Sequence, residues 1–321
     1  DEADITETID TEVLVVGMGT GGIPAMISAA ENGAKVLGID RQGTPHNVRE
    51  DIGAIDSRLQ QASFDEFPEF RIEKKEAVED IVRYANGFVN YDLVKLWADE
   101  SGAMVDWLTD IIQRDGKLVM EFEGGVGDTS DPGRDKAFAT GHSPQPTDAL
   151  GEDEEWGFAE SILAYAAEQG AEVRWYTEFI KCETDEVGRV TGVIAEGADG
   201  YIQFNAAKGV IVATGDYEND DEMMAYYEPA MANIYRKEQN KTGDGHKMGV
   251  WAGGEIELTT HTKMIHDARV GRVDTPHLPV NAKGERFMCE GPMQGYLNNY
   301  VREYIHEAGG DAKAGNLYTI V

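Results

Sequence analysis

The hydrophobic pattern near the start of the chain predicts a strand, a helix and a second strand in close succession. Residues 12–16 end in an apolar run that stops at Gly17, which is typical of a buried parallel strand. Small and apolar residues over 21–31 have helical spacing and are followed directly by an Asn-Gly pair, a common helix stop. A second apolar run over 35–39 ends at Asp40. We therefore expect a β-α-β unit here.

The rest of the chain changes between helical and strand patterns. Residues 91–108 place apolar positions on one face of a helix, and residues 156–169 have the pattern of another helix. Residues 123–150 are rich in Gly, Asp, Ser and Pro, so we expect a long loop there, with His142 exposed. Residues 1–9 are acidic and weakly patterned, and we expect an irregular tail. Four strands are expected close together, at 172–176, 189–195, 201–205 and 209–213, with a hairpin turn at Asp199-Gly200.

Three glycines join the first strand to the helix at the spacing G-x-G-x-x-G. Gly17, Gly19 and Gly22 allow a tight turn and let the backbone approach a phosphate, while the helix N-terminus supplies N–H groups. Asp40, at the end of the second strand, is placed to accept hydrogen bonds from ribose hydroxyls. The motif alone is weak, but with both strands and the acid in order it predicts a dinucleotide site. Asp40 by itself suits NAD as well as FAD.

The charge balance excludes several classes of partner. The 321 residues include 60 Asp and Glu against 28 Lys and Arg, a formal charge of −32, which repels nucleic acid and anionic lipid. No apolar run approaches the ~20 residues that span a bilayer. Cys182 and Cys289 are too few for an iron–sulfur cluster or a Cys-rich zinc site, so we expect no metal. The opening DEADITETID lacks both Met and a signal-like apolar segment, which fits a trimmed start and leaves a cytoplasmic or an exported location open.

A β-meander within residues 171–217 separates this chain from a plain NAD-binding domain, in which helices and strands would continue to alternate. With that meander, several stretches resemble the fumarate-reductase-like flavoprotein family, which includes soluble fumarate reductases, urocanate reductases, 3-ketosteroid dehydrogenases and reductases of gut anaerobes. They run in family order from residue 12 to residue 290: VLVVGMGTGGIPAMISAAENGAKVLGID, LVKLWADESGAMVDWL, EVGRVTGVIAEGADG, KGVIVATGDY, TGDGHKMGVWAGG and LPVNAKGERFMCE. The resemblance implies an α/β fold, with a doubly wound, Rossmann-like FAD-binding domain and its inserted β-meander over 10–258. The start of an α+β capping domain would follow over 259–321.

The resemblance also implies FAD as the cofactor and a set of residues that bind it. The ADP half would lie at the first glycine turn and the end of the second strand, and the later turns would approach the rest of the cofactor. The implied residues are Gly17, Gly19, Gly21, Gly22, Asp40, Arg41, Asn47, Gly53, Ala54, Phe179, Ala213, Thr214, Gly215, Gly243 and Asp244. Asp244 is also expected to cap the N-terminus of the helix that follows it.

Some positions depart from the family pattern near the flavin ring. Asp216 stands where the family has the second glycine of an A-T-G-G turn. The segment 47–54 reads NVREDIGA where the family has an Asn-Ser/Thr segment running to Ala-Gly-Gly. His46 lies one residue out of step with the histidine to which some relatives attach FAD covalently. We therefore expect FAD to be bound non-covalently.

In this family a hydride passes between flavin N5 and a carbon next to an electron-withdrawing group, while a side chain handles the proton on the neighbouring carbon. His261 or His266 corresponds to a substrate-binding histidine, and Arg272 lies one residue from the position of a substrate arginine. The arginine that donates the proton in fumarate reductases falls on Gln294, and a neutral amide does no acid–base chemistry near neutral pH. Tyr296 is the expected donor instead, with an ordinary packing role as the alternative.

These matches predict a reductase of activated C=C bonds, acting on an enone or a conjugated unsaturated acid rather than on fumarate. Its electrons would come from a donor protein or domain. Two alternatives stay open. One is the reverse reaction, dehydrogenation next to a ketone as in 3-ketosteroid dehydrogenases. The other is a non-catalytic FAD-binding subunit or fragment, suggested by Gln294 and by a sequence that stops at Val321, where the family's capping domain would continue.

Overall fold

The computed structural model describes residues 4–46, 48, 51–85, 87–124, 138–150, 157–229, 240–257, 261, 278–281, 283–286 and 318–320. The chain divides into two compact units. Unit 1 comprises Asp1–Ile52, Trp107–Glu121 and Ser143–Leu258, and unit 2 comprises Gly53–Asp106, Phe122–His142 and Thr259–Val321. This division differs from the expected boundaries, because 53–106 and 122–142 group with the residues that follow 258.

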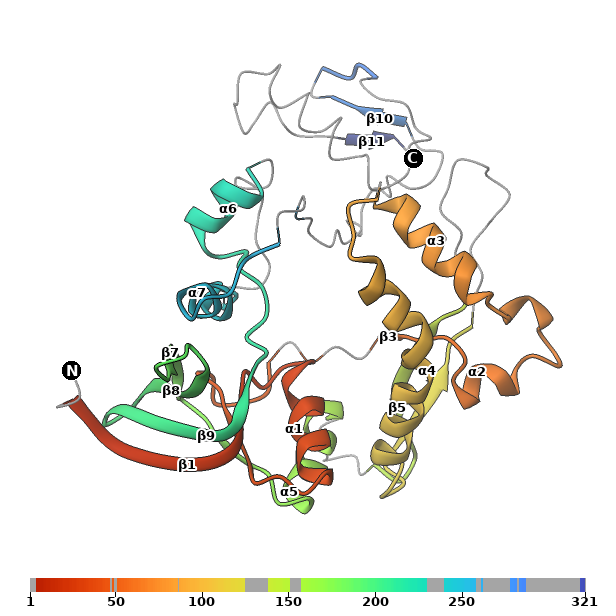
Figure 1. Cartoon of the computed structure of the whole chain (residues 1–321). Helices are drawn as coiled ribbons and strands as arrows, with labels where there is room; N and C mark the ends of the chain where they lie inside the picture. The colour runs from red at the N-terminus through yellow and green to blue at the C-terminus, as the bar shows by residue number, and fades with distance from the viewer. Residues whose placement is uncertain are drawn as a thin grey trace. The chain divides into compact units, whose positions relative to one another are not determined.

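Six strands form the sheet of unit 1, in the order β6-β2-β1-β9-β8-β7. They are β1 (Ile5–Val16), β2 (Val36–Ile39), β6 (Glu172–Arg174), β7 (Glu178–Thr184), β8 (Val190–Gly197) and β9 (Gly200–Val212). Figure 1 labels β1, β9, β8 and β7. β6, β2, β1 and β9 pair in parallel, whereas β9, β8 and β7 form an antiparallel meander. The expected doubly wound sheet with an inserted meander is therefore confirmed.

β1 is longer than the sequence predicts, and the expected tail over 1–9 is wrong from Ile5 onward. Its first half pairs with the first half of β9, so that Ile9 lies opposite Phe204. The two strands expected at 201–205 and 209–213 are one continuous strand for the same reason. Most side chains of β1 before Thr11 are exposed or half-buried, so this ribbon lacks the apolar run that would mark it as a strand.

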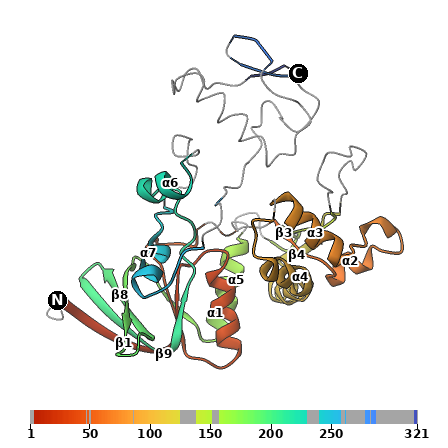
Figure 2. The same cartoon turned by 45° about the horizontal axis from the view of Figure 1, so that its top comes forward.

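Helices cover the parallel half of the sheet. α1 (Gly22–Glu31) buries Ile23, Met26, Ile27 and Ala30 and ends at Asn32, as expected. It packs beside the sheet and beside α5 (Phe158–Glu168), which Figure 2 also shows. Unit 1 also contains α6 (Asp221–Tyr227) and α7 (Asp244–Trp251), and α7 lies against β7. The core on this side joins sheet and meander through residues that include Leu14, Val16, Ile39, Phe179, Val193 and Phe204.

Unit 2 is mainly helical among its described residues. It contains α2 (Arg58–Ala62), the short 3-10 helix η2 (Pro68–Phe70) and α3 (Lys74–Tyr84), while α4 (Tyr91–Ile112) continues into unit 1. β10 (Leu278–Val280) pairs antiparallel with β11 (Tyr318–Ile320). A third sheet has the order β3-β5-β4, with β3 (Ile52–Gly53), β4 (Leu118–Phe122) and β5 (Gly141–Pro146). α4 confirms the helix expected over 91–108.

β5 corrects the loop expected over 123–150. His142 lies on this strand and is fully buried, not exposed. Its Nε2 lies 2.6 Å from the hydroxyl of Ser57, and its Nδ1 lies 2.8 Å from the carbonyl oxygen of Thr140. A buried imidazole needs hydrogen-bond partners for its ring nitrogens, and these two groups supply them. The prediction failed because Ser57, which lies 85 positions away in sequence, belongs to a contact that the local pattern does not encode.

Candidate functional site: a cofactor pocket at the ends of the parallel strands

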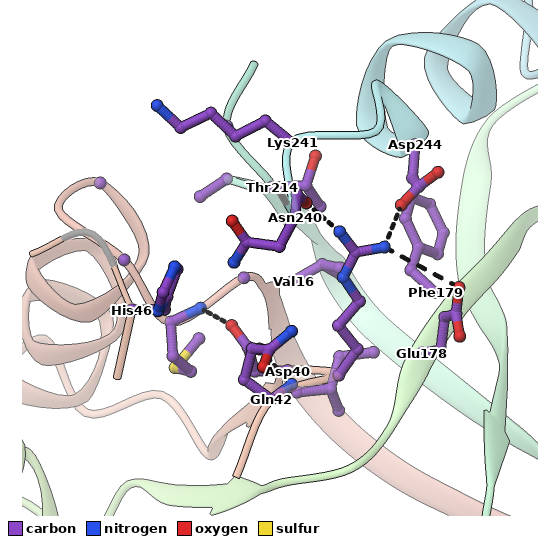
Figure 3. Close-up of a pocket in the computed structure, with 18 of the residues that line it drawn as sticks. Val16, Asp40, Gln42, His46, Glu178, Phe179, Thr214, Asn240, Lys241 and Asp244 are labelled. Carbon is purple, nitrogen blue, oxygen red and sulfur yellow. Dashed lines mark hydrogen bonds and ion pairs between the residues drawn. The ribbon is translucent and has the colours of Figure 1, made fainter. Parts of the chain in front are cut away.

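A cavity of about 320 Å³ lies in unit 1, where β1, β2 and β9 end (Figure 3). Val16, Ile39 and Ala213 mark the ends of these strands at the cavity wall. In doubly wound sheets, ligands bind outside the carboxyl ends of the strands, so this is the position expected for a dinucleotide. The volume falls within the range usual for ligand pockets.

The first glycine turn forms one wall of this cofactor pocket. Gly17 has φ +98°, and a Cβ at this position would lie 2.4 Å from the carbonyl oxygen of Ala213. A Cβ at Gly22 would lie 1.7 Å from the carbonyl oxygen of Gly17. Both contacts are far inside van der Waals distance, so only glycine fits at either position. Gly19 and Gly21 lie between them and line the pocket, as expected.

Asp40 connects the end of β2 to this turn. Its Oδ2 accepts the amide N–H of Met18 at 2.7 Å, and its Oδ1 accepts that of Gln42 at the same distance. A carboxylate oxygen has two lone pairs, so each of the two retains acceptor capacity toward a ligand in the pocket. Figure 3 shows the Asp40 side chain beside the turn. Its predicted role toward a ribose is therefore compatible with a second role in holding the turn.

Arg41 follows Asp40 and contacts the segment 240–244, which forms the opposite wall. Its Nη1 donates to the hydroxyl of Thr242 at 3.0 Å and to Oδ2 of Asp244 at 3.1 Å. Its Nη2 donates to the carbonyl oxygen of Asn240, and Glu178 lies 4.0 Å from the guanidinium. The dashed lines in Figure 3 mark the contacts with Asn240, Asp244 and Glu178. The sequence predicts that Arg41 binds the cofactor. In the structure its guanidinium donates hydrogen bonds to acceptors of the protein.

The later turns and the meander complete the pocket. Phe179, on β7, is 5% exposed and lines the cavity, as do Ala213, Thr214 and Gly215. The hydroxyl of Thr214 accepts the N–H of Gly245 at 3.0 Å, which fixes the start of α7 against the end of β9. These four residues, which the sequence predicts to bind the cofactor, therefore line the pocket. Their contacts with a cofactor stay predictions.

The expected capping role of Asp244 is wrong. Gly243 is the N-cap of α7, and it adopts φ +71°, which favours glycine. Asp244 is already the first helical residue, so its carboxylate does not reach back over the helix end. That carboxylate instead accepts hydrogen bonds from Arg41 and, at 2.7 Å, from Thr242. An acid in the first turn still interacts favourably with the helix dipole.

Other predicted site residues belong to unit 2 or lie outside the described residues. Gly53 and Ala54 belong to unit 2, where the carbonyl of Gly53 accepts the indole N–H of Trp97 and Ala54 is fully buried. His261 is half-buried and also belongs to unit 2. Asn47, His266, Arg272 and Tyr296 lie outside the described residues. Their roles stay predictions.

The structure adds pocket residues that the sequence analysis missed. They are chiefly Gln42, Thr177, Glu178, Asn240 and Lys241, and the side chain of His46 lies beside the first turn (Figure 3). The sequence contains a weak indication of Asn240 and Lys241, because they come shortly before the G-D-G motif at 243–245. Within the described part of the chain, no group of three or more His, Cys, Asp or Glu side chains could hold a metal ion.

The electrostatics of the pocket suit the ADP half of a dinucleotide. No side chain caps the N-terminus of α1, and no acid lies in its first turn, so the positive end of its dipole is available to a phosphate. Carboxylate acceptors for ribose hydroxyls lie nearby on Asp40. The turn with no room for a Cβ, the helix terminus and the acid together fit an FAD molecule bound by its ADP half.

Comparison with known proteins agrees with this geometry. A family model described as FAD binding domain matches residues 12–318. The chain is 25% identical to a fumarate reductase (cytochrome) of Shewanella frigidimarina, over 88% of this chain and 48% of that protein. It is 25% identical to a vinyl phenol reductase of Lactiplantibacillus plantarum, over 92% of this chain and 56% of that protein. The chain therefore spans about half the length of the curated relatives it matches.

A solved structure shares the fold. The 3-ketosteroid-Δ4-(5α)-dehydrogenase of Rhodococcus jostii superposes with a TM-score of 0.71 at 20% identity, covering 93% of this chain and 65% of that one. Among the residues that the structure describes, none of the helices has the length and apolar character needed to cross a membrane.

Proposed function

We propose, because the chain belongs to the FAD binding domain family, that it is the cofactor-binding part of an oxidoreductase that reduces an activated C=C bond. Its cofactor is FAD. The observation that carries the proposal is the pocket of unit 1, in which the Gly17 turn, Asp40 and the uncapped α1 terminus meet at the strand ends. The relatives named above as reductases of fumarate and vinyl phenol support the reaction class.

The proposed reaction adds a hydride and a proton across the double bond of an enone or a conjugated unsaturated acid. Bound FAD would supply the hydride at flavin N5, and a donor protein or domain would supply the two electrons. The protein itself must hold the electron-withdrawing group of the substrate and deliver the proton to the neighbouring carbon. We assign the first task to His261 or His266 with Arg272, and the second to Tyr296.

Tyr296 suits the proton transfer for a simple reason. A phenol has an unperturbed pKa of ~10 and is protonated at neutral pH, so it can donate to a developing carbanion. Gln294, which takes the place of the family's donor arginine, has no proton of comparable acidity. The substitution argues for a conjugated ketone or aryl acid as substrate, because fumarate reduction in the family depends on that arginine.

Two other functions stay as rival proposals. Dehydrogenation next to a ketone fits the fold shared with the 3-ketosteroid dehydrogenase, although an identity of 20% supports the fold only. A non-catalytic FAD-binding subunit fits Gln294, which stands where the family has its donor arginine. A reductase predicts that an unsaturated compound reoxidises the reduced flavin. A dehydrogenase predicts that a saturated ketone reduces the oxidised flavin. A non-catalytic subunit predicts neither reaction.

The deciding experiment uses the full-length protein loaded with FAD and reduced anaerobically by a dye. Flavin absorbance is then followed after mixing with an enone, an aryl propenoic acid, fumarate or a saturated ketone. We expect reoxidation by the enone or the aryl acid. Tyr296→Phe should retain FAD and its reduction by dye, while reoxidation slows by about 10²–10⁴-fold, the usual contribution of one positioned acid. Gln294→Ala is the matched control and should leave the rate unchanged.

The same experiment can reject the proposal. Loss of reoxidation in Gln294→Ala with retention in Tyr296→Phe would exclude Tyr296 as the donor. Failure of every unsaturated compound to reoxidise the flavin, in a protein that binds FAD stoichiometrically, would favour the non-catalytic function.

A further inference from the structure

Arg41 is the cation that joins the two walls of the cofactor pocket. It comes from the end of β2, next to Asp40, and its guanidinium contacts three residues of the segment 240–244. We propose that Arg41 is a positioning residue: it holds this segment and the carboxylate of Asp244 in place for FAD and does not itself bind the cofactor. The proposal rests on FAD as the cofactor and is independent of which substrate is reduced.

The guanidinium of Arg41 already has several hydrogen-bond acceptors on the protein. Nη1 donates to Thr242 and Asp244, and Nη2 donates to the carbonyl oxygen of Asn240. Arginine in some dinucleotide sites binds a ribose phosphate, but it then turns its donors toward the ligand. The donors of Arg41 are instead turned toward the protein.

The positive charge of Arg41 lies among carboxylates of the pocket lining. FAD carries a diphosphate, and the pocket lining includes the carboxylates of Asp40, Glu178, Asp216 and Asp244. The side chains of Arg41 and Asp244 are 26% and 23% exposed, so their attraction is only partly screened by water. Arg41 thereby offsets a negative charge that would otherwise repel the diphosphate. Removing the guanidinium would leave Asp244 with the more distant ammonium of Lys247, at 3.9 Å, and would release the segment.

A mechanical connection runs from Arg41 to α7. Thr242 donates to the same Asp244 oxygen that accepts from Arg41, so the three side chains form one hydrogen-bonded group. Gly243 then turns the chain into α7 through a positive φ, and its N–H donates to the carbonyl of Asp216 at 3.2 Å. A binding site whose walls are ordered before the ligand arrives loses less entropy on binding. Arg41 supplies that order.

The test measures FAD affinity of the apoprotein from the change in flavin fluorescence on binding. Arg41→Met should raise the FAD dissociation constant by about 10–100-fold, the effect expected for hydrogen bonds to a charged group. Arg41→Lys should recover less than about threefold of that loss, because a single ammonium cannot satisfy acceptors that a planar fork reaches together. Thr242→Val should weaken binding by about 3–10-fold, since it removes one hydroxyl from the group.

A double-mutant cycle separates positioning from direct binding. In an Asp244→Asn background, Arg41→Met should cost less than it does in the wild type, because one of the residues through which it acts is already altered. Circular dichroism of each apoprotein confirms that the variants are folded.

Several results would overturn the proposal. Restoration of wild-type affinity by Arg41→Lys, or a full cost of Arg41→Met in the Asp244→Asn background, would make Arg41 a direct charge contact. An unchanged dissociation constant in Arg41→Met would also overturn it. If Arg41→Met does not fold, Thr242→Val and Arg41→Lys decide by the same criteria. If the wild-type protein itself does not bind FAD, the assignment of FAD as the cofactor is wrong. That result is distinct from any effect measured in the variants.

Discussion

The carboxylate of Asp40 accepts the amide N–H of Met18 across 2.7 Å, joining the end of β2 to the glycine turn that ends β1. A charge-assisted hydrogen bond of this kind is stronger than a neutral one. The second carboxylate oxygen holds Gln42 in the same way. Asp40 therefore holds the turn in place, in addition to its proposed role as a ribose acceptor, and its removal should affect FAD binding through both roles.

The first prediction concerns this carboxylate. Asp40→Ala should raise the FAD dissociation constant by about 10–100-fold, because a charged acceptor is lost together with the brace. Asp40→Asn retains one acceptor oxygen and should give a smaller loss. Flavin fluorescence titration of the apoproteins measures both. FMN lacks the ribose that Asp40 would contact and should bind poorly to the wild type, so equal affinity for FMN and FAD would contradict the assignment.

The second prediction concerns the closeness of the first turn to α1. A methyl group at Gly22 would lie 1.7 Å from the carbonyl oxygen of Gly17, so Gly22→Ala must push the helix away from the turn. We expect a loss of stability of about 3 kcal/mol or more, and loss of bound FAD. Gly249→Ala is the matched control, because nothing lies within 4 Å of its Cβ position in α7. It should gain about 0.5–1 kcal/mol in urea unfolding.

Local signals explain which parts of the pocket the sequence predicted. The turn at Gly17 and the acid at Asp40 belong to one continuous β-α-β unit, in which spacing alone brings them together. The hydrogen bond from Arg41 to Thr242 joins residues 201 positions apart, and nothing in either local sequence specifies that pairing. The residue type of Asp244 predicts that it is the N-cap of α7. Gly243 is the N-cap instead, because the chain enters the helix through a positive φ at that position.

Burial explains the other errors. His142 is surrounded by glycine, serine and proline in sequence, which predicts an exposed loop, but Ser57 and Thr140 satisfy its ring inside unit 2. Ile5 and its neighbours are polar on one face and pair with a strand about 195 positions away. Periodicity reports the environment of a segment only when one face is clearly buried, and neither segment meets that condition.

The third prediction concerns the buried pair of Ser57 and His142. Nδ1 of His142 lies at a carbonyl oxygen, which accepts only, so Nδ1 carries a proton, and in the neutral form of the ring Nε2 accepts from the Ser57 hydroxyl. That hydroxyl also caps α2 by accepting the N–H of Gln60 at 3.0 Å. Ser57→Ala should therefore cost about 2–4 kcal/mol, since a buried donor and a helix cap are lost together. Ser63→Ala, at the other end of α2, should cost under about 1.5 kcal/mol in the same urea titration.

The fourth prediction concerns the pH dependence of stability in unit 1. Burial tends to raise the pKa of Asp220, but the hydrogen bonds from Lys247 and from the N–H of Met223 outweigh it and lower the pKa below its usual value. A carboxyl whose pKa is lower in the folded state adds stability above its unfolded pKa of ~3.9, and loses it as the pH falls through the folded value.

Asp220→Ala should accordingly cost about 1–2 kcal/mol at pH 7, the usual worth of an N-cap, and less at pH 3. Thermal unfolding at both pH values measures the difference from the wild type. Glu255→Gln, which changes an exposed carboxylate in the same unit, should show no such difference. An equal cost of Asp220→Ala at pH 3 and pH 7 would exclude the charged form as the source of the stabilisation.

The last prediction assigns a contact to Lys241. Its residue lines the pocket next to Asn240, and the structure gives its ammonium no hydrogen bond or ion pair with any described residue. Figure 3 shows the side chain directed away from Asp244 and Glu178, the carboxylates that Arg41 contacts. In a chain with a formal charge of −32, an unpaired cation at a pocket for a diphosphate has a clear ligand in that anion.

Lys241→Gln should raise the FAD dissociation constant by about tenfold, because a half-buried charge-assisted contact is worth about 1.5 kcal/mol. The difference from the wild type should shrink as salt is raised toward 1 M, where the screening length falls to about 3 Å. Lys181→Gln makes the same change in net charge on β7, at a lysine paired with Glu183, and should leave FAD affinity unchanged. Equal effects of the two variants would show that only the overall charge matters, and Lys241 would then have no specific contact with the cofactor.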